Sequence, residues 1–292
     1  MVIPGQSLPP AHRGYLGGVD TVISVDEVAR QARAIAQCVS IEQLDALAND
    51  DPHLRIDDLH AGYGQMEILH GFNLRVARGQ SLCLIGPNGA GKSTVLHSIF
   101  GFTSIFSGSI SAARNGQNVE VTHMSANEKL RSAGIAYILQ DKSVFPNMTV
   151  EENLWMGAYL MDRTTQAKQA AEKVFDTYPR LAARRKHPAK VLSGGERRLL
   201  EISRALVMDP QILLVDEPSI GLEPRFIDAV FEILRDLQHK EGKTIVIVEQ
   251  NAKKGLEFAD IGYVLVSGKL ALAGRTDDLL ANPDVSRLFL GG

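Results

Sequence analysis

Gly86-Pro87-Asn88-Gly89-Ala90-Gly91-Lys92-Ser93 is the stretch of this 292-residue chain that decides its fold. It fits the pattern G-x4-G-K-[ST] at every required position. A continuous apolar run, Ser81 to Ile85, comes before it, and helical spacing from Lys92 to Phe100 comes after it. A buried strand, a glycine-rich turn and a helix in this order predict an α/β domain with a phosphate-binding loop.

The chemistry of such a loop lies in its backbone. Its N–H groups must turn inward around a phosphate, which side chains would obstruct, and the positive end of the following helix adds to the attraction. Lys92 is expected to reach the β- and γ-phosphates, and the Ser93 hydroxyl is expected to bind Mg²⁺. The predicted ATP-binding residues of this stretch are Gly86, Pro87, Asn88, Gly89, Ala90, Gly91, Lys92, Ser93 and Thr94.

Composition narrows the class of protein. The 31 Lys and Arg residues against 34 Asp and Glu residues give a net charge of −3, with 45% hydrophobic and 22% charged residues. This balance argues against a strongly basic nucleic-acid binder and against an acidic disordered chain, so we expect no nucleic-acid partner. Two cysteines are too few for a disulfide framework, and no apolar run approaches the ~18 residues of a membrane span. A cytoplasmic protein is therefore expected.

Two regions are predicted along the chain. Residues 1–52 form an N-terminal extension, partly helical, with capping-box signatures at Ser24 with Glu27 and at Ser40 with Gln43. Asn49 to Pro52 should end the second helix. The extension is either an appended segment that packs loosely or a helical pair with a regulatory or docking role. The pattern over residues 53–292 predicts one α/β domain.

A pair of acids follows a second buried strand. Ile212 to Val215 runs directly into Asp216 and Glu217. Ligands bind open α/β sheets at the carboxyl ends of strands, and successive strand residues point to opposite faces. We therefore assign Asp216 to Mg²⁺ and Glu217 to the attacking water as a general base.

The segment Leu192-Ser193-Gly194-Gly195-Glu196 lies 23 residues before the acid pair, counted from Ser193 to Asp216, and opens a helix rich in Arg and Leu. With this segment in place, residues 53–292 resemble the ATP-binding-cassette (ABC) transporter ATPases. The resemblance implies an α/β P-loop NTPase fold with a mixed-sheet core, an antiparallel β subdomain and a helical subdomain at about 145–208. It also implies ATP hydrolysis with Mg²⁺.

The same resemblance implies further site residues. Ser193, Gly194, Gly195 and Glu196 would form a second anion site that closes on ATP bound by another ATPase subunit. Tyr63 matches the aromatic residue that stacks on adenine, and Gln140 matches the glutamine that contacts Mg²⁺ and the attacking water. Most relatives carry a catalytic histidine where Gln250 stands; a glutamine amide can donate a hydrogen bond there but carries no charge.

Several stretches narrow the resemblance to the ATPase subunits of branched-chain amino acid importers, with urea and amide importers sharing nearly the same pattern. These stretches are Val144–Leu154, Glu217–Pro224, Val248–Ala252 and Leu279–Gly292. The alternatives are a lipopolysaccharide- or exporter-type ABC ATPase, which shares the string at Ser193–Arg198, and a non-transport ATPase acting on DNA or ribosomes.

The importer interpretation implies partners and a location. The chain would work at the cytoplasmic face of the cell membrane, as a peripheral protein, with integral membrane permease subunits and a second ATPase subunit, identical or homologous. A substrate-binding receptor would act indirectly. The apolar segment Val144–Met148 would either meet a permease helix or pack inside the helical subdomain.

Overall fold

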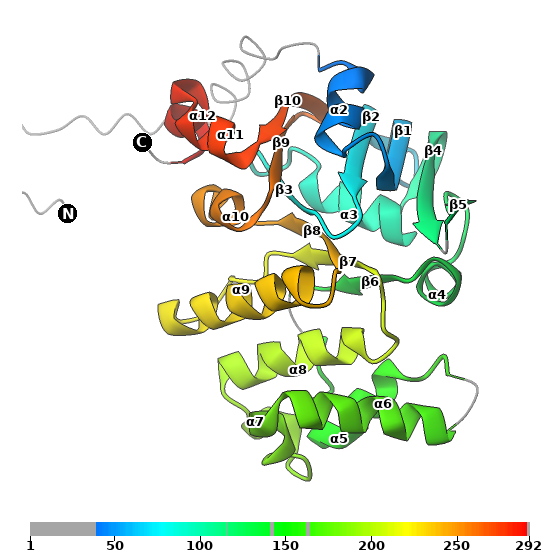
Figure 1. Cartoon of the computed structure of the whole chain (residues 1–292), viewed down its shortest axis with the longest axis vertical. Helices are drawn as coiled ribbons and strands as arrows, with labels where there is room; N and C mark the ends of the chain where they lie inside the picture. The colour runs from blue at the N-terminus through cyan, green and yellow to red at the C-terminus, as the bar shows by residue number, and fades with distance from the viewer. Residues whose placement is uncertain (1–38, 115, 141–142, 162–163, 291–292) are drawn as a thin grey trace, which may run out of the picture.

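The computed structural model describes residues 39–114, 116–140, 143–161 and 164–290. The predicted capping box of Ser24 and Glu27 lies outside these residues. Within them, no helix is both long enough and apolar enough to cross a bilayer. The molecule has an upper part built on two sheets and a lower part built of helices (Figure 1).

The first sheet has the strand order β10-β9-β3-β8-β7-β6. Neighbouring strands from β9 to β6 are parallel, whereas β10 is antiparallel to β9, so the sheet is mixed. The central strands β3, β7 and β8 are buried along their whole length, as their uninterrupted apolar runs predict. The strands are β3 (Ser81–Ile85), β6 (Ile135–Ile138), β7 (Ile212–Asp216), β8 (Thr244–Val248), β9 (Ile261–Val266) and β10 (Lys269–Arg275).

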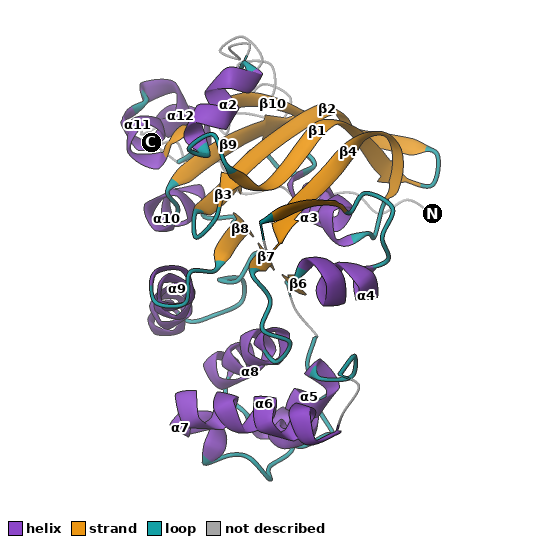
Figure 2. Ribbon diagram, turned by 45° about the vertical axis from the view of Figure 1, so that its right-hand side comes forward, coloured by secondary structure: helices purple, strands orange, loops and turns teal. Residues whose placement is uncertain are grey.

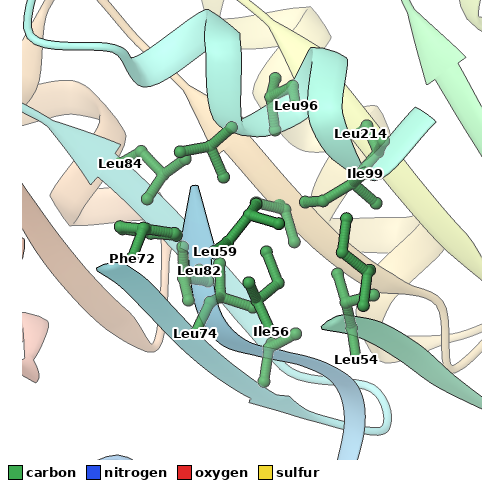
Figure 3. Close-up of a cluster of buried hydrophobic side chains, with 14 of the residues drawn as sticks. Leu54, Ile56, Leu59, Phe72, Leu74, Leu82, Leu84, Leu96, Ile99 and Leu214 are labelled. Atoms are coloured by element: carbon green, nitrogen blue, oxygen red, sulfur yellow. The ribbon is translucent and has the colours of Figure 1, made fainter. Parts of the chain in front are cut away.

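The second sheet is antiparallel, with the strand order β2-β1-β4-β5. Buried apolar residues of β1 and β2 pack toward the first sheet, with α3 lying between the two sheets (Figure 2). Figure 3 shows this shared core, in which leucines of both sheets meet the helix residues Leu96 and Ile99. The elements are β1 (Pro52–Tyr63), β2 (Met66–Ala77), β4 (Ser104–Arg114), β5 (Gln117–Glu120) and α3 (Lys92–Phe100).

A second core lies on the other side of the mixed sheet. There the amphipathic helix α9 buries Val230, Phe231, Leu234 and Leu237. Helices α10, α11 and α12 complete this layer. Their bounds are α9 (Pro224–His239), α10 (Ala252–Phe258), α11 (Thr276–Ala281) and α12 (Pro283–Phe289), and the short elements α4 (Ala126–Glu128) and the π-helix η1 (Lys129–Ala133) precede β6.

The helical subdomain forms the lower part in Figure 1 and has its own small core. Capping boxes begin two of its helices, at Thr149 for α5 and at Ser193 for α8, and the second is the helix predicted to open at Leu192–Glu196. Arg185 and Lys186, at the surface of this subdomain, both contact the buried carboxylate of Glu151. The elements are α5 (Val150–Gly157), α6 (Thr164–Thr177), α7 (Pro179–Ala182), the 3-10 turn η2 (Ala189–Val191) and α8 (Gly194–Leu206).

Helix α2 (Ile41–Leu47) belongs to the predicted N-terminal extension and begins at the expected capping box of Ser40 and Gln43. It lies against β2 and β10 at the top of the molecule (Figure 1). Leu44 is fully buried in the core shared by the two sheets. Asp45 accepts a hydrogen bond from the buried Arg75 of β2 at 2.7 Å. This end of the extension therefore contributes to the packing of the cassette.

Candidate functional site

Most of the predicted site residues line one open pocket of about 530 Å³ at the carboxyl ends of β3, β7 and β8. The pocket walls come from four loops and from the start of α3, which places residues far apart in sequence around one volume. Its lining residues are Tyr63, Ile68, Asn88, Gly89, Gly91, Lys92, Ser93, Thr94, Gln140, Glu217, Ile220 and Gln250.

The glycine-rich loop is held tightly from behind. A Cβ atom at Gly86 would lie 2.2 Å from the carbonyl oxygen of Leu265, so only glycine fits at that position. Gly91 caps α3 with φ 100°, a left-handed conformation that glycine adopts without strain. At Gly89, by contrast, nothing lies within 4 Å of an added Cβ. The loop is therefore closed toward the protein and open toward the pocket.

Lys92 is buried and lies inside this loop. Its ammonium group donates to the carbonyl oxygens of Gly86 at 2.9 Å and Pro87 at 3.1 Å. Burial lowers the pKa of Lys92, while the carboxylates of Glu217 and Asp216 oppose that effect. A buried cation that bonds only carbonyl groups of its own loop is suited to receive an anion.

Asp216 lies at the end of β7, behind the pocket, and is almost fully buried. Ser93 donates its hydroxyl proton to Asp216 Oδ1 at 3.2 Å, and Tyr137 donates to Asp216 Oδ2 at 2.8 Å. No local pattern singles out Tyr137 in the sequence, because nothing in a short strand signals which residue faces a neighbour's carboxylate. The adjoining oxygens of Ser93 and Asp216 are of the kind that Mg²⁺ prefers, so these residues fit a magnesium ion.

Glu217 follows Asp216 and turns into the pocket. Its backbone has φ 42°, an uncommon conformation for this residue, and its N–H donates to Val248 O at 2.8 Å, which anchors it to β8. Gln140 Nε2 donates to Glu217 Oε2 at 2.8 Å. Partial burial, with the neighbouring Asp216 charge, raises the pKa of Glu217.

The aromatic side of the pocket carries Tyr63 at the end of β1. Its side chain is exposed, and its hydroxyl forms a hydrogen bond of 2.5 Å with His97 Nδ1 of α3. Burial lowers the pKa of His97, which favours the neutral ring. His97 is a second residue that the sequence analysis missed, since a lone histidine on a helix gives no signal of its partner.

A buried carboxylate connects two loops of the pocket. Glu249, next to Gln250, accepts hydrogen bonds from the backbone N–H groups of Ser219 at 3.0 Å and Asn251 at 3.3 Å. The loop after β7 is thereby fixed to the loop after β8. Gln250 itself is exposed and lines the pocket.

The segment Ser193–Glu196 does not line this pocket. Ser193 caps α8 and accepts a hydrogen bond from the N–H of Glu196, whose carboxylate in turn accepts one from the N–H of Ser193 at 2.9 Å. The carboxylate of Glu196 thus serves the helix terminus. Gly194 lines a separate groove with Gln140 and Ile220, between the helical subdomain and the sheets. In one copy of the chain the predicted second anion site and the pocket remain apart.

Known proteins resemble this chain in sequence and in fold. Residues 69–220 match the family described as ABC transporter. A high-affinity branched-chain amino acid transport ATP-binding protein, BraG of Pseudomonas aeruginosa, is 39% identical over 82% of this chain and 100% of its own length. A similarly named protein of Archaeoglobus fulgidus, LivF, is 38% identical over 82% of this chain and 98% of its own. The structure of the ADP conformation of MJ1267, an ATP-binding cassette of an ABC transporter, matches with TM-score 0.71 and 28% identity, over 82% of this chain and 99% of that one.

Proposed function

This chain belongs to the ABC transporter family and is one of its nucleotide-binding ATPases, and from this premise we propose that it energises an importer of branched-chain amino acids. The observation that carries the proposal is the match to two branched-chain amino acid transport ATP-binding proteins over nearly their whole length. Substrate class, partners and the roles of single residues are parts of this proposal.

ATP is proposed to bind with its phosphates in the glycine-rich loop and its adenine on Tyr63. The exposed ring of Tyr63 offers a face for stacking. Lys92 would exchange its two carbonyl partners for the β- and γ-phosphate oxygens, because a charged acceptor makes the stronger hydrogen bond. Ser93, Asp216 and Gln140 would hold Mg²⁺, which when bound neutralises phosphate charge.

Hydrolysis is proposed to start at Glu217. Its carboxylate Oε2, held by Gln140, would accept a proton from the water that attacks the γ-phosphate. The raised pKa of Glu217 favours that transfer. Glu249 is a positioning residue in this scheme, since it fixes the backbone beside Gln250, and the amide of Gln250 would donate to a γ-phosphate oxygen.

Two partners complete the proposal. A second ATPase subunit would bring its Ser193–Glu196 segment onto the nucleotide held here, which accounts for a segment that lies outside its own pocket. Permease subunits would dock on the exposed apolar side chains of the helical subdomain, Phe145, Trp155, Met156 and Tyr159. The chain would then lie on the cytoplasmic face of the membrane, with a receptor acting through the permease.

The test uses the chain expressed with its permeases and receptor in vesicles loaded with ATP. We expect uptake of labelled leucine, isoleucine or valine, and we expect Glu217→Gln to keep ATP binding while slowing hydrolysis by about 10²–10⁴-fold. Glu232→Gln, an exposed substitution on α9, is the matched control. Normal turnover of Glu217→Gln would refute the base assignment. Uptake of urea alone, or a lipopolysaccharide-transport phenotype, would refute the substrate class and leave the ATPase assignment intact.

A further inference from the structure

A second cluster of chemically active side chains lies outside the nucleotide pocket, on the antiparallel sheet. His60 of β1 and His70 of β2 both point their Nδ1 atoms at the same carboxylate oxygen of Glu67, at 2.6 Å and 2.9 Å. One ligand atom from each of the three residues can be chosen so that all lie within 4.8 Å of one another. Asp58 lies near by, with Oδ1 at 3.7 Å from His60 Nε2.

Two irregularities in the β1–β2 pairing gather these side chains. Between the pairs Leu59↔Phe72 and Ala61↔Leu69, the single residue His60 stands opposite both His70 and Gly71. Between Ala61↔Leu69 and Gly62↔Glu67, the extra residue on β2 is Ile68. A regular strand would alternate residues 67 and 70 between opposite faces, whereas an extra residue re-aims the side chains on either side of it.

We propose that His60, Glu67 and His70 form a binding site for a divalent transition-metal ion, with Zn²⁺ as its representative. Two imidazole nitrogens and one carboxylate oxygen are a ligand set that zinc takes in proteins, with a fourth position left for water. Magnesium prefers oxygen ligands, so this site would be chemically distinct from the one proposed at Ser93 and Asp216.

The composition and exposure of the cluster suit a cation. It brings together one carboxylate oxygen and two imidazole nitrogens, the kinds of ligand atom that a divalent transition-metal ion takes. The three side chains are each about one-third exposed, at 34%, 36% and 39% for His60, Glu67 and His70. An ion can therefore reach them from solution without unfolding the sheet.

The position of the site gives it a structural consequence. Its ligands come from both strands of the hairpin that carries Tyr63 and Ile68, two residues of the nucleotide pocket. His70 also donates its backbone N–H to Gly268 O at 3.0 Å, in the turn between β9 and β10. A bound ion would cross-link β1 to β2 beside the adenine-facing end of the pocket. This inference needs no assumption about the transported substrate.

The test is a titration of the full chain, free of any affinity tag and stripped with a chelator, with Zn²⁺ against a chromophoric competing chelator. We expect one tight equivalent that persists in saturating Mg²⁺ and ATP. His60→Ala and His70→Ala should each weaken it by at least about tenfold. His239→Ala, which changes an exposed histidine at the end of α9, should bind as the unchanged chain does.

Glu67→Gln keeps the shape of the side chain and removes its charge, so it should also weaken binding. Equal affinity in the unchanged chain and in the His60→Ala/His70→Ala double variant would overturn the proposal. Should the variants fail to fold, X-ray absorption of the zinc-loaded unchanged chain decides instead. Scattering from two imidazole ligands supports the site, and a shell of oxygen ligands alone overturns it.

Discussion

Asp45→Ala is the substitution that most directly tests whether the N-terminal extension stabilises the cassette. Arg75 has no exposed side-chain surface, and its guanidinium is held by Asp45 at 2.7 Å, by Asp57 at 2.5 Å and by the carbonyl oxygens of Ile56 and Leu74. Removing one partner of a fully buried ion pair costs about 3–5 kcal/mol. Because Asp45 is 31% exposed and Asp57 remains in place, we expect a loss below that range, about 2 kcal/mol.

The assay is urea unfolding followed by far-UV circular dichroism. With a denaturant slope of about 3 kcal/mol per molar, the expected loss lowers the unfolding midpoint by about 0.7 M. Asp45→Asn keeps a hydrogen-bond acceptor without the charge and should lose about half as much. Leu44→Ala, which empties a fully buried position in the same helix, should lose about 3 kcal/mol.

Glu232→Gln on the exposed face of α9 serves as the control and should shift the midpoint little. A midpoint for Asp45→Ala that matches this control would refute the reasoning and favour a loosely packed extension. Deletion of residues 1–50 removes Leu44 and Asp45 together, so it should destabilise the chain more than either substitution alone.

Three further predictions concern buried groups. Gly268→Ala places a Cβ 1.8 Å from Ile68 O at φ 75°, so it should destabilise the chain by at least about 2 kcal/mol in the same urea assay. Lys129 is fully buried, which lowers its pKa to about 8. Lys129→Met should therefore raise the free energy of unfolding by about 2 kcal/mol at pH 7. This gain should shrink as the pH rises from 8 toward 10.5, because the lysine loses its proton first in the folded state and then in the unfolded state. Burial lowers the pKa of His53 to about 4, so His53 should reduce stability by about 2 kcal/mol as the pH falls from 6.5 to 4, a dependence that His53→Gln should remove.

Each of these three predictions has an outcome that would contradict it. Unchanged unfolding of Gly268→Ala would mean that the turn moves away from β2 without cost. A Lys129→Met variant less stable than the parent at pH 7 would mean that the ammonium contributes more than its burial costs. Parallel acid unfolding curves for the parent and His53→Gln would remove His53 as the source of the pH dependence.

The order of elements was predictable because it depends on local pattern. The strand Ser81–Ile85 and the helix Lys92–Phe100 occur at the predicted residues, and a helix begins at the predicted capping box of Ser40 and Gln43. Apolar periodicity, glycine and proline act within a few residues, so one sequence suffices to locate them.

The contacts within the site were less predictable. Tyr137 and Asp216 are 79 residues apart in the sequence, and no local signal pairs them. Their hydrogen bond forms because β6 and β7 lie side by side in the sheet. The bond between Gln140 and Glu217 has the same origin. Likewise, nothing in the spacing of His60, Glu67 and His70 reveals that two irregular pairings turn them toward one another.

The sequence by itself determined the glycine-rich loop Gly86–Ser93 between a strand and a helix, the buried strand that ends in two acids, and the helix that begins with Ser193-Gly194-Gly195, because backbone freedom, helix capping and apolar runs are local properties. Only the tertiary structure decided that the carboxylate of Asp216 is buried behind Ser93 while that of Glu217 faces the pocket. It also decided that Arg75 depends on Asp45 of the extension. Burial and charge pairing arise between segments far apart in the chain, and strand order and register bring those segments together.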